Sequence, residues 1–291
     1  MATAGQWLQG ARPRTLPAAI APIAVGAGLA AYVDSMLPSR VLLALIVSMA
    51  LQVGVNYAND YSDGIKGTDA VRVGPIRLVG QGLAKPNHVK LAAFASFAIA
   101  AAAGLVLVAV TGEWWLLVVG VASIAAAWLY TGGPRPYGYA GLGEVFVFVF
   151  FGVVPVVGTA YVQTLAITST DVVASVGVGL LACAILVTNN LRDIGGDQAV
   201  GKVTLAVRLG DRATRRLYVG IVVAALAIPV ILAFMASPWV LLTILTGVLA
   251  VQPLRVVGGG ALGPQLIPAL KGTGILLLAY GLVLGLTLGL S

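Results

Sequence analysis

The first group of residues that could carry out chemistry lies in the segment NDYSDGIKGTD at 59–69, which contains three aspartates. If the apolar helix before it continues past Asn59, then Asn59, Asp60 and Asp63 recur at intervals of three and four residues and share one helical face. Asp69 closes the segment. The sequence therefore predicts a cluster of carboxylates at one end of a helix.

A second group lies in the segment NNLRDIGGDQAVGKVT at 189–204. Asp193 and Asp197 are four residues apart, so they also share one face if this segment is helical. The polar residues that flank them are Asn189, Asn190 and Arg192. The chain thus repeats the combination of an apolar run that ends in Asn and Asp.

Carboxylate and amide oxygens with no His or Cys beside them suit a hard cation such as Mg²⁺, which is typically held by one or two carboxylates together with phosphate oxygens of a substrate. The candidate metal ligands are Asp60, Asp63, Asp69, Asp193 and Asp197. Lys66, Arg77 and Lys202 lie nearby in the sequence and would neutralise the remaining oxygens of a bound diphosphate. Any one aspartate alone could equally be a solvated residue at a helix end, but the clustering favours a site.

Other candidate substrate contacts are less specific. Tyr61 and Tyr130 fall near a predicted membrane boundary, where aromatic residues are common, but they could also line a cavity and stabilise a carbocation through their ring faces. Arg12 and Arg14 lie at the mouth of the first apolar run. They help to set the topology of the chain and could also contact an anionic substrate.

The elements that position these residues are predicted to be membrane helices. Apolar residues make up 59% of the 291 positions, and charged residues make up 9%, where a soluble domain carries about 25%. This composition excludes a water-soluble enzyme. Lipid cannot satisfy open backbone groups, so the apolar runs are expected to be helices. Nine spans are predicted, at about 16–33, 41–58, 91–111, 114–130, 143–163, 171–191, 217–235, 238–254 and 273–290.

The distribution of charge predicts the orientation of these spans. Every Lys and Arg except Arg40 falls on one side of the predicted topology, so that side is expected to be cytoplasmic, with the C-terminus outside. The two long polar loops, about 59–90 and 192–216, lie on the cytoplasmic side. The formal net charge of +7 indicates anionic lipids or an anionic substrate rather than nucleic acid. We expect one multi-pass domain over 1–291 in the cell membrane.

These motifs resemble those of the UbiA superfamily of intramembrane prenyltransferases. The resemblance rests on NDYSDGIKGTD, on VGPIRLVGQG at 73–82 and on NNLRDIGGDQAVGKVTLAVRLG at 189–210, and ARPRTLPAAIAPI at 11–23 also matches. It covers essentially the whole chain and is strongest for the 1,4-dihydroxy-2-naphthoate polyprenyltransferase branch, which acts in menaquinone synthesis. Where the superfamily has an aspartate eight residues after the first Asn, this chain has Gly67, and Asp69 follows. Whether Asp60 or Asp69 supplies the additional metal ligand is left open.

The resemblance implies nine helices around a central cavity, closed by cytoplasmic cap loops. It also implies that Mg²⁺ binds the diphosphate of a polyprenyl donor. Asp63 and Asp193 would then be catalytic, helped by Lys66, Arg77 and Lys202. The expected substrate-binding residues are Asn59, Asn189, Asn190, Arg192, Tyr61, Tyr130, Arg12 and Arg14. The allylic group would pass to the naphthoate ring, with loss of CO₂, to give demethylmenaquinone or its quinol.

Two alternatives remain at this point: a UbiA-type enzyme with another acceptor, and a secondary transporter that uses intramembrane acids. The transporter is less favoured because such acids belong near the membrane midplane, whereas these fall at helix ends. The residue that binds the acceptor carboxylate is not identified, and Arg77 and Lys85 are candidates. Prenyl chain length and oligomeric state are also left open.

Overall fold

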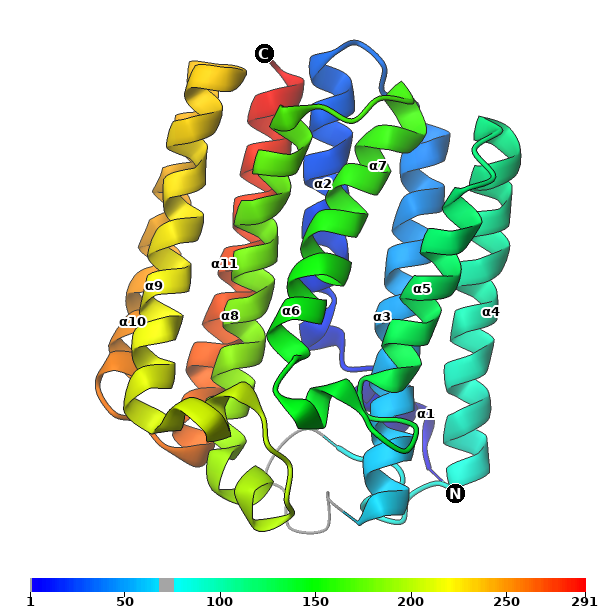
Figure 1. Cartoon of the computed structure of the whole chain (residues 1–291), viewed down its shortest axis with the longest axis vertical. Helices are drawn as coiled ribbons and strands as arrows, with labels where there is room; N and C mark the ends of the chain where they lie inside the picture. The colour runs from blue at the N-terminus through cyan, green and yellow to red at the C-terminus, as the bar shows by residue number, and fades with distance from the viewer. Residues whose placement is uncertain (1, 68–75) are drawn as a thin grey trace.

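The computed structural model describes residues 2–67 and 76–291, and every regular element in that part of the chain is a helix (Figure 1). The elements are α1 (Ala4–Gly10), η1 (Pro13–Thr15), α2 (Pro17–Tyr32), α3 (Pro38–Lys66), α4 (Pro86–Thr111), α5 (Leu116–Leu129), η2 (Tyr137–Ala140), α6 (Gly143–Phe148), η3 (Val149–Val153), α7 (Val154–Thr164), α8 (Ser169–Ala199), α9 (Leu205–Met235), η4 (Pro238–Ala250), α10 (Val251–Gly258), η5 (Gly263–Leu266) and α11 (Ile267–Gly289).

The structure confirms a multi-helix membrane protein but not the count of nine spans. Among the described residues, seven helical segments are long and apolar enough to cross a membrane. An eighth is formed if the pair Ala4–Thr15 and Pro17–Tyr32, bent by 49°, counts as one span. The helix α5 coincides with the remaining predicted span but has 14 residues, or about 21 Å of helix against about 30 Å of hydrocarbon.

Several helices are longer than their apolar runs. α3 continues through the first aspartate motif to Lys66 and stops at Gly67, whose φ of 72° is a left-handed conformation that glycine adopts without strain. α8 likewise continues through the second motif to Ala199. Residues 59–66 of the first motif and 189–199 of the second are therefore helical, so the side chains of Asn59 and Asp63, and those of Asp193 and Asp197, are held in fixed directions one turn apart.

The helices on one side of the bundle pack closely around α11. A Cβ added to Gly28 of α2 would clash with the backbone oxygen of Gly285 in α11, and one added to Gly281 would lie 2.6 Å from the Cβ of Ala21. Small residues thus let these two helix backbones approach closely, as is common in membrane bundles. The main buried cluster joins α2, α8, α9 and α11, while α3 and α4 build a separate, smaller one.

The polar ends of α3 and α8 lie at the same end of the bundle, together with the N-terminus, and the C-terminus lies at the opposite end (Figure 1). The two aspartate motifs, 130 residues apart in the sequence, are therefore brought to one end of the molecule, as predicted.

Candidate active site

A cavity of about 960 Å³ lies inside the bundle and connects the aspartate-bearing end to an apolar interior. Its polar wall includes Asn59, Asp63, Arg77, Asn189, Arg192 and Lys202. Its apolar wall includes Ile23, Ala44, Leu107, Leu116 and Val162. The cavity therefore has room for a molecule with a charged head and a long apolar tail.

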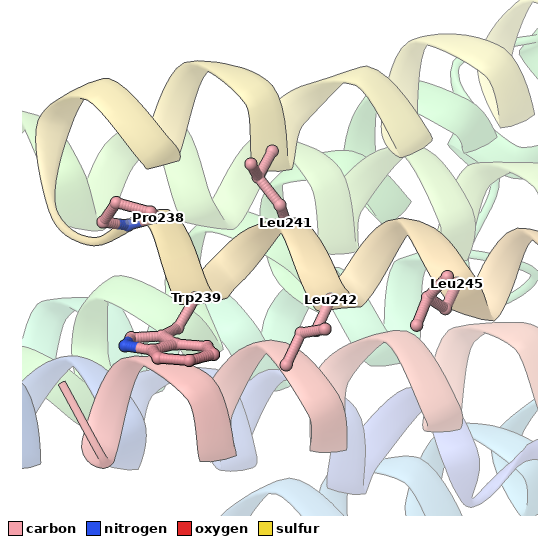
Figure 2. A pocket seen from close by; sticks show the side chains of 5 residues that line it. All are labelled: Pro238, Trp239, Leu241, Leu242 and Leu245. Carbon is pink, nitrogen blue, oxygen red and sulfur yellow. The ribbon is translucent and has the colours of Figure 1, made fainter.

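A second depression, on the surface of η4, has a different character. It is lined by Pro238, Trp239, Leu241, Leu242 and Leu245, whose side chains Figure 2 shows along η4. No ionisable side chain lines it. This surface fits contact with lipid tails better than chemistry.

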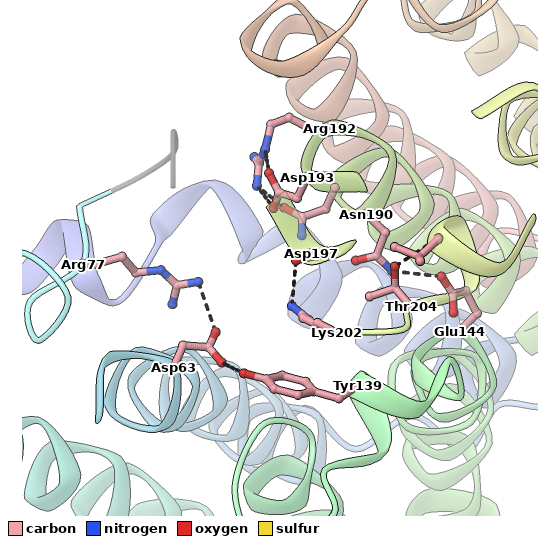
Figure 3. Close-up of polar contacts among 12 residues, drawn as sticks. Asp63, Arg77, Tyr139, Glu144, Asn190, Arg192, Asp193, Asp197, Lys202 and Thr204 are labelled. Carbon is pink, nitrogen blue, oxygen red and sulfur yellow. Dashed lines mark hydrogen bonds and ion pairs between the residues drawn. The ribbon is translucent and has the colours of Figure 1, made fainter. Parts of the chain in front are cut away.

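Asp63 is buried at the polar end of the cavity and is held from two sides (Figure 3). The hydroxyl of Tyr139 donates a hydrogen bond of 2.7 Å to its Oδ1, and Nη2 of Arg77 lies 3.7 Å from its Oδ2. Asn59, one turn earlier on α3, accepts a hydrogen bond of 2.8 Å from the Thr131 hydroxyl. The segment between α3 and α4, which carries Arg77, and the loop after α5, which carries Thr131 and Tyr139, thus fix the side chains at the end of α3.

The carboxylates of α8 also have basic partners (Figure 3). Arg192 donates two hydrogen bonds of 2.7 Å to Asp193 and a third, of 2.8 Å, to Oδ1 of Asn189. Nζ of Lys202 lies 3.5 Å from Asp197. These side chains are largely buried, so their charges interact more strongly than they would in water.

Tyr139 links the two motifs and is not among the residues predicted from the sequence. Its ring lies 4.9 Å from Nζ of Lys66 and 5.2 Å from Nζ of Lys202, and its hydroxyl contacts Asp63. Its backbone oxygen accepts a hydrogen bond from the Val203 N–H. The signal available in the sequence was an aromatic residue in the short polar loop PRPYGY, on the same predicted side as both aspartate motifs.

The donor set at this end of the bundle fits Mg²⁺. Asp63, Asn59 and Asn189 present oxygen atoms on the cavity wall. Asp193 and Asp197 are not part of the lining but are paired with Arg192 and Lys202, which are. No group of three or more His, Cys, Asp or Glu side chains that could hold a metal ion is found in residues 2–67 and 76–291. Mg²⁺ is commonly held by one or two carboxylates, with phosphate and water oxygens completing its shell. Asp69 lies outside the described residues.

Asp60 is used differently from the predicted metal ligation. Its two oxygens accept hydrogen bonds from the backbone N–H groups of Leu78 (2.7 Å) and Val79 (3.1 Å). It is 1% exposed, so little of it remains for another partner. Asp60 therefore fastens the loop that carries Arg77 to the side of α3.

Three other predicted contacts are also placed away from the cavity wall. Tyr61 stacks on Trp128 at 5.9 Å between ring centroids, and Asn190 donates a hydrogen bond of 3.0 Å to Glu144. Neither contributes to the cavity lining. Lys85, a candidate for the acceptor carboxylate, is exposed and also lies outside the lining.

The structure brings Arg12, Arg14 and Tyr130, three of the candidate substrate contacts, to the cavity wall. Tyr130 packs edge-on against Tyr137, which is also on the wall. Burial raises the pKa of the Tyr137 phenol, so it stays protonated and donates a hydrogen bond of 2.7 Å to the Ala126 carbonyl. The cavity wall near Asp63 thus combines aromatic rings with polar side chains.

Comparisons with known proteins agree with this arrangement. The model of the UbiA prenyltransferase family matches residues 19–258. A 1,4-dihydroxy-2-naphthoate octaprenyltransferase of Mycobacterium tuberculosis is 51% identical over 282 residues, covering 97% of this chain and 96% of that protein. The protein of the same name from Mycobacterium leprae is 47% identical and covers 100% of this chain and 98% of its own.

Solved structures share the fold. A UbiA homolog from Archaeoglobus fulgidus, bound to GPP and Mg²⁺, matches with a TM-score of 0.67 at 15% identity, over 96% of this chain and 99% of that one. The apo structure of a UbiA homolog from Aeropyrum pernix K1 matches with a TM-score of 0.69 at 16% identity, over 93% and 96% of the two chains. At these identities the likeness is one of fold.

Proposed function

The chain belongs to the UbiA prenyltransferase family, and on that premise we propose that it transfers a polyprenyl group from a polyprenyl diphosphate to 1,4-dihydroxy-2-naphthoate, with loss of CO₂. The product is demethylmenaquinone or its quinol, a step of menaquinone biosynthesis. The identity of 51% and 47% to two naphthoate octaprenyltransferases, over nearly the whole chain, supports the choice of this acceptor. The observation that carries the proposal is a single cavity that joins both aspartate motifs to an apolar interior.

The donor diphosphate binds at the polar end of the cavity. Asp63, Asp193 and Asp197 would hold Mg²⁺ there, and Asp69 is the remaining candidate ligand because Asp60 is engaged by the loop backbone. When bound, Mg²⁺ supplies the positive charge that stabilises a departing diphosphate.

Basic side chains at the same end support the departure of the diphosphate. Arg77, Arg192 and Lys202 are already within reach of the carboxylates and line the cavity, so they can turn to the phosphate oxygens as negative charge develops there. Lys66 lies beside them, donating a hydrogen bond of 2.7 Å to the Thr131 carbonyl.

The remainder of the cavity protects the reaction. The isoprenoid tail lies along the apolar wall, which keeps water away from the allylic cation. The aromatic faces of Tyr130 and Tyr137 line the cavity near the reacting carbon and stabilise positive charge. The electron-rich ring of the acceptor attacks the allylic carbon, and its carboxylate then leaves as CO₂, which restores aromaticity.

We further propose that α5 completes a set of nine crossings and that the aspartate-bearing end faces the cytoplasm. The location of the basic residues supports this orientation, since Arg40 alone among the described Lys and Arg residues lies at the other end, where it donates hydrogen bonds to the carbonyls of Val162 and Val110. The C-terminus is then outside. Labelling of single cysteines placed at each end of the bundle in intact cells tests this topology.

The experiment that tests the function is an assay of the purified full-length protein with Mg²⁺, a polyprenyl diphosphate and candidate aromatic acids, with the product identified by mass spectrometry. We expect a prenylated, decarboxylated naphthalene product. Asp63→Asn and Asp193→Asn are each expected to abolish turnover while the yield of folded protein is retained. Near-normal turnover in either variant would remove the metal assignment, and a product formed from a benzoate acceptor alone would replace the proposed acceptor.

A further inference from the structure

The wall of the cavity is strongly cationic. Among the described residues, its charged side chains are Arg12, Arg14, Arg77, Arg192, Lys202, Lys271 and a single carboxylate, Asp63. Three of the bases lie against aspartates at the ends of α3 and α8, as Arg77 does with Asp63, and so belong to the proposed diphosphate end. The cavity therefore carries positive charge beyond that which those aspartates balance.

Arg14 and Lys271 are the two cations on this wall that stand apart from the aspartates. Both are exposed, and neither side chain makes a hydrogen bond or ion pair with another residue in the described part of the chain. They come from neighbouring elements, because a Cβ added to Gly274 of α11 would lie 3.7 Å from the backbone oxygen of Arg14. Gly274 also lines the cavity and lies three residues after Lys271, on the same helical face.

The backbone that carries Arg14 is firmly positioned. The Thr15 hydroxyl donates a hydrogen bond of 2.9 Å to the Arg12 carbonyl and accepts one from each of the side-chain amides of Gln52 (2.9 Å) and Asn56 (3.0 Å) on α3. Asn56 also donates to the Ala11 carbonyl at 2.9 Å. The turn η1 is thus fastened to α3, so Arg14 extends from a fixed point on the wall.

We infer that Arg14 and Lys271 form the site for the carboxylate of the aromatic acceptor. A guanidinium offers a fork of N–H donors that matches a carboxylate, and an ammonium group adds a point charge. The diphosphate has its own end of the cavity, at α3 and α8, where aspartates can hold a metal ion. The wall at η1 and α11 has cations but no described carboxylate, which suits an anion that binds without a metal.

This assignment rests on the proposed function and adds a specificity determinant to it. An acceptor anchored by its carboxylate at η1 and α11 presents its ring to the cavity, between that wall and the polar end. Because both side chains are exposed, solvent weakens the interaction, and we expect each to contribute about tenfold to acceptor affinity.

The test compares the KM values of the two substrates in full-length variants Arg14→Gln and Lys271→Gln. We expect the KM for 1,4-dihydroxy-2-naphthoate to rise about tenfold in each, while the KM for the polyprenyl diphosphate stays within about twofold. Lys271→Arg keeps the charge and is expected to retain most of the affinity. The matched control is Arg216→Gln, which removes an exposed base of α9 that does not line the cavity.

A second measurement uses 1,4-dihydroxynaphthalene, which has the same rings and hydroxyls but no carboxylate. It is expected to inhibit the parent protein and both Gln variants with equal strength. An unchanged acceptor KM, or a rise in the donor KM instead, overturns the assignment. Failure of the proposed function is distinct, since the parent protein itself would then form no prenylated product from the naphthoate. If Arg14→Gln does not fold, Lys271→Gln decides the question alone.

Discussion

The hydroxyl of Tyr139 offers a sharp test of how the two aspartate motifs are held together. Tyr139→Phe removes the 2.7 Å hydrogen bond to Asp63 but keeps the ring between Lys66 and Lys202. A hydrogen bond to a charged group contributes about 1.5–3 kcal/mol, and every 1.4 kcal/mol corresponds to a factor of about ten. In the variant, Asp63 still lies 3.7 Å from Arg77 and still lines the polar end of the cavity, where other polar groups can interact with it. The loss should therefore be near the lower limit of this energy range. We therefore expect kcat/KM to fall about tenfold.

The assay is steady-state prenyl transfer with each substrate varied in turn, alongside thermal unfolding in detergent. The effect should fall on the donor diphosphate, because Asp63 lies at that end of the cavity, and the acceptor KM should change little. Tyr218→Phe is the control, since it also loses a 2.7 Å hydroxyl contact, to Thr273, but in the packed core away from Asp63. Equal losses of activity in both variants, or none in Tyr139→Phe, would refute the positioning role.

Two further predictions concern the framework of the site. Gly28→Ala should lower the unfolding temperature clearly, because the new Cβ clashes with the backbone oxygen of Gly285. Gly120→Ala is the control and should leave the unfolding temperature unchanged, because the space around Gly120 is open. Equal unfolding temperatures in the two variants would contradict the close packing of α2 and α11. Asp60→Asn should lower the free energy of unfolding by about 1–3 kcal/mol, because an NH₂ donor replaces one of the two oxygens that accept a hydrogen bond from the loop backbone. Tryptic cleavage after Arg77 should then be faster than in the parent, while Asp34→Asn should leave that rate unchanged.

Hydropathy located the helices but not their ends. Each predicted span coincides with a helix because only helices and closed barrels satisfy the backbone in lipid. The same index does not show where a helix continues beyond the apolar run. α3 extends to Lys66 and α8 to Ala199, past their apolar residues. α9 spans Leu205–Met235 but is broken at Gly210 (φ 75°), so its continuous part begins about six residues before the predicted start.

The sequence indicated which segments form the candidate site but not which of their residues face the cavity. Asn189 and its neighbour Asn190 share a chemical type, but successive residues point about 100° apart around a helix, so one lines the cavity and the other contacts Glu144. The same rotation turns Tyr61 toward Trp128 while Asn59 and Asp63 face inward. Tyr139 was missed because its place depends on how the loop after α5 folds over the end of α3, which no local pattern records.

The three pairings of Asp63, Asp193 and Asp197 with basic side chains have a consequence for the order in which the substrates load. Each base contacts a carboxylate of the protein, and on the proposed function it would also contact a phosphate oxygen of the donor. A cation that takes over the carboxylates alone would leave three bases unbalanced, and a diphosphate that takes over the bases alone would leave three carboxylates unbalanced. Each ligand therefore improves the affinity for the other, which is positive linkage, and the two are favoured to enter as one complex.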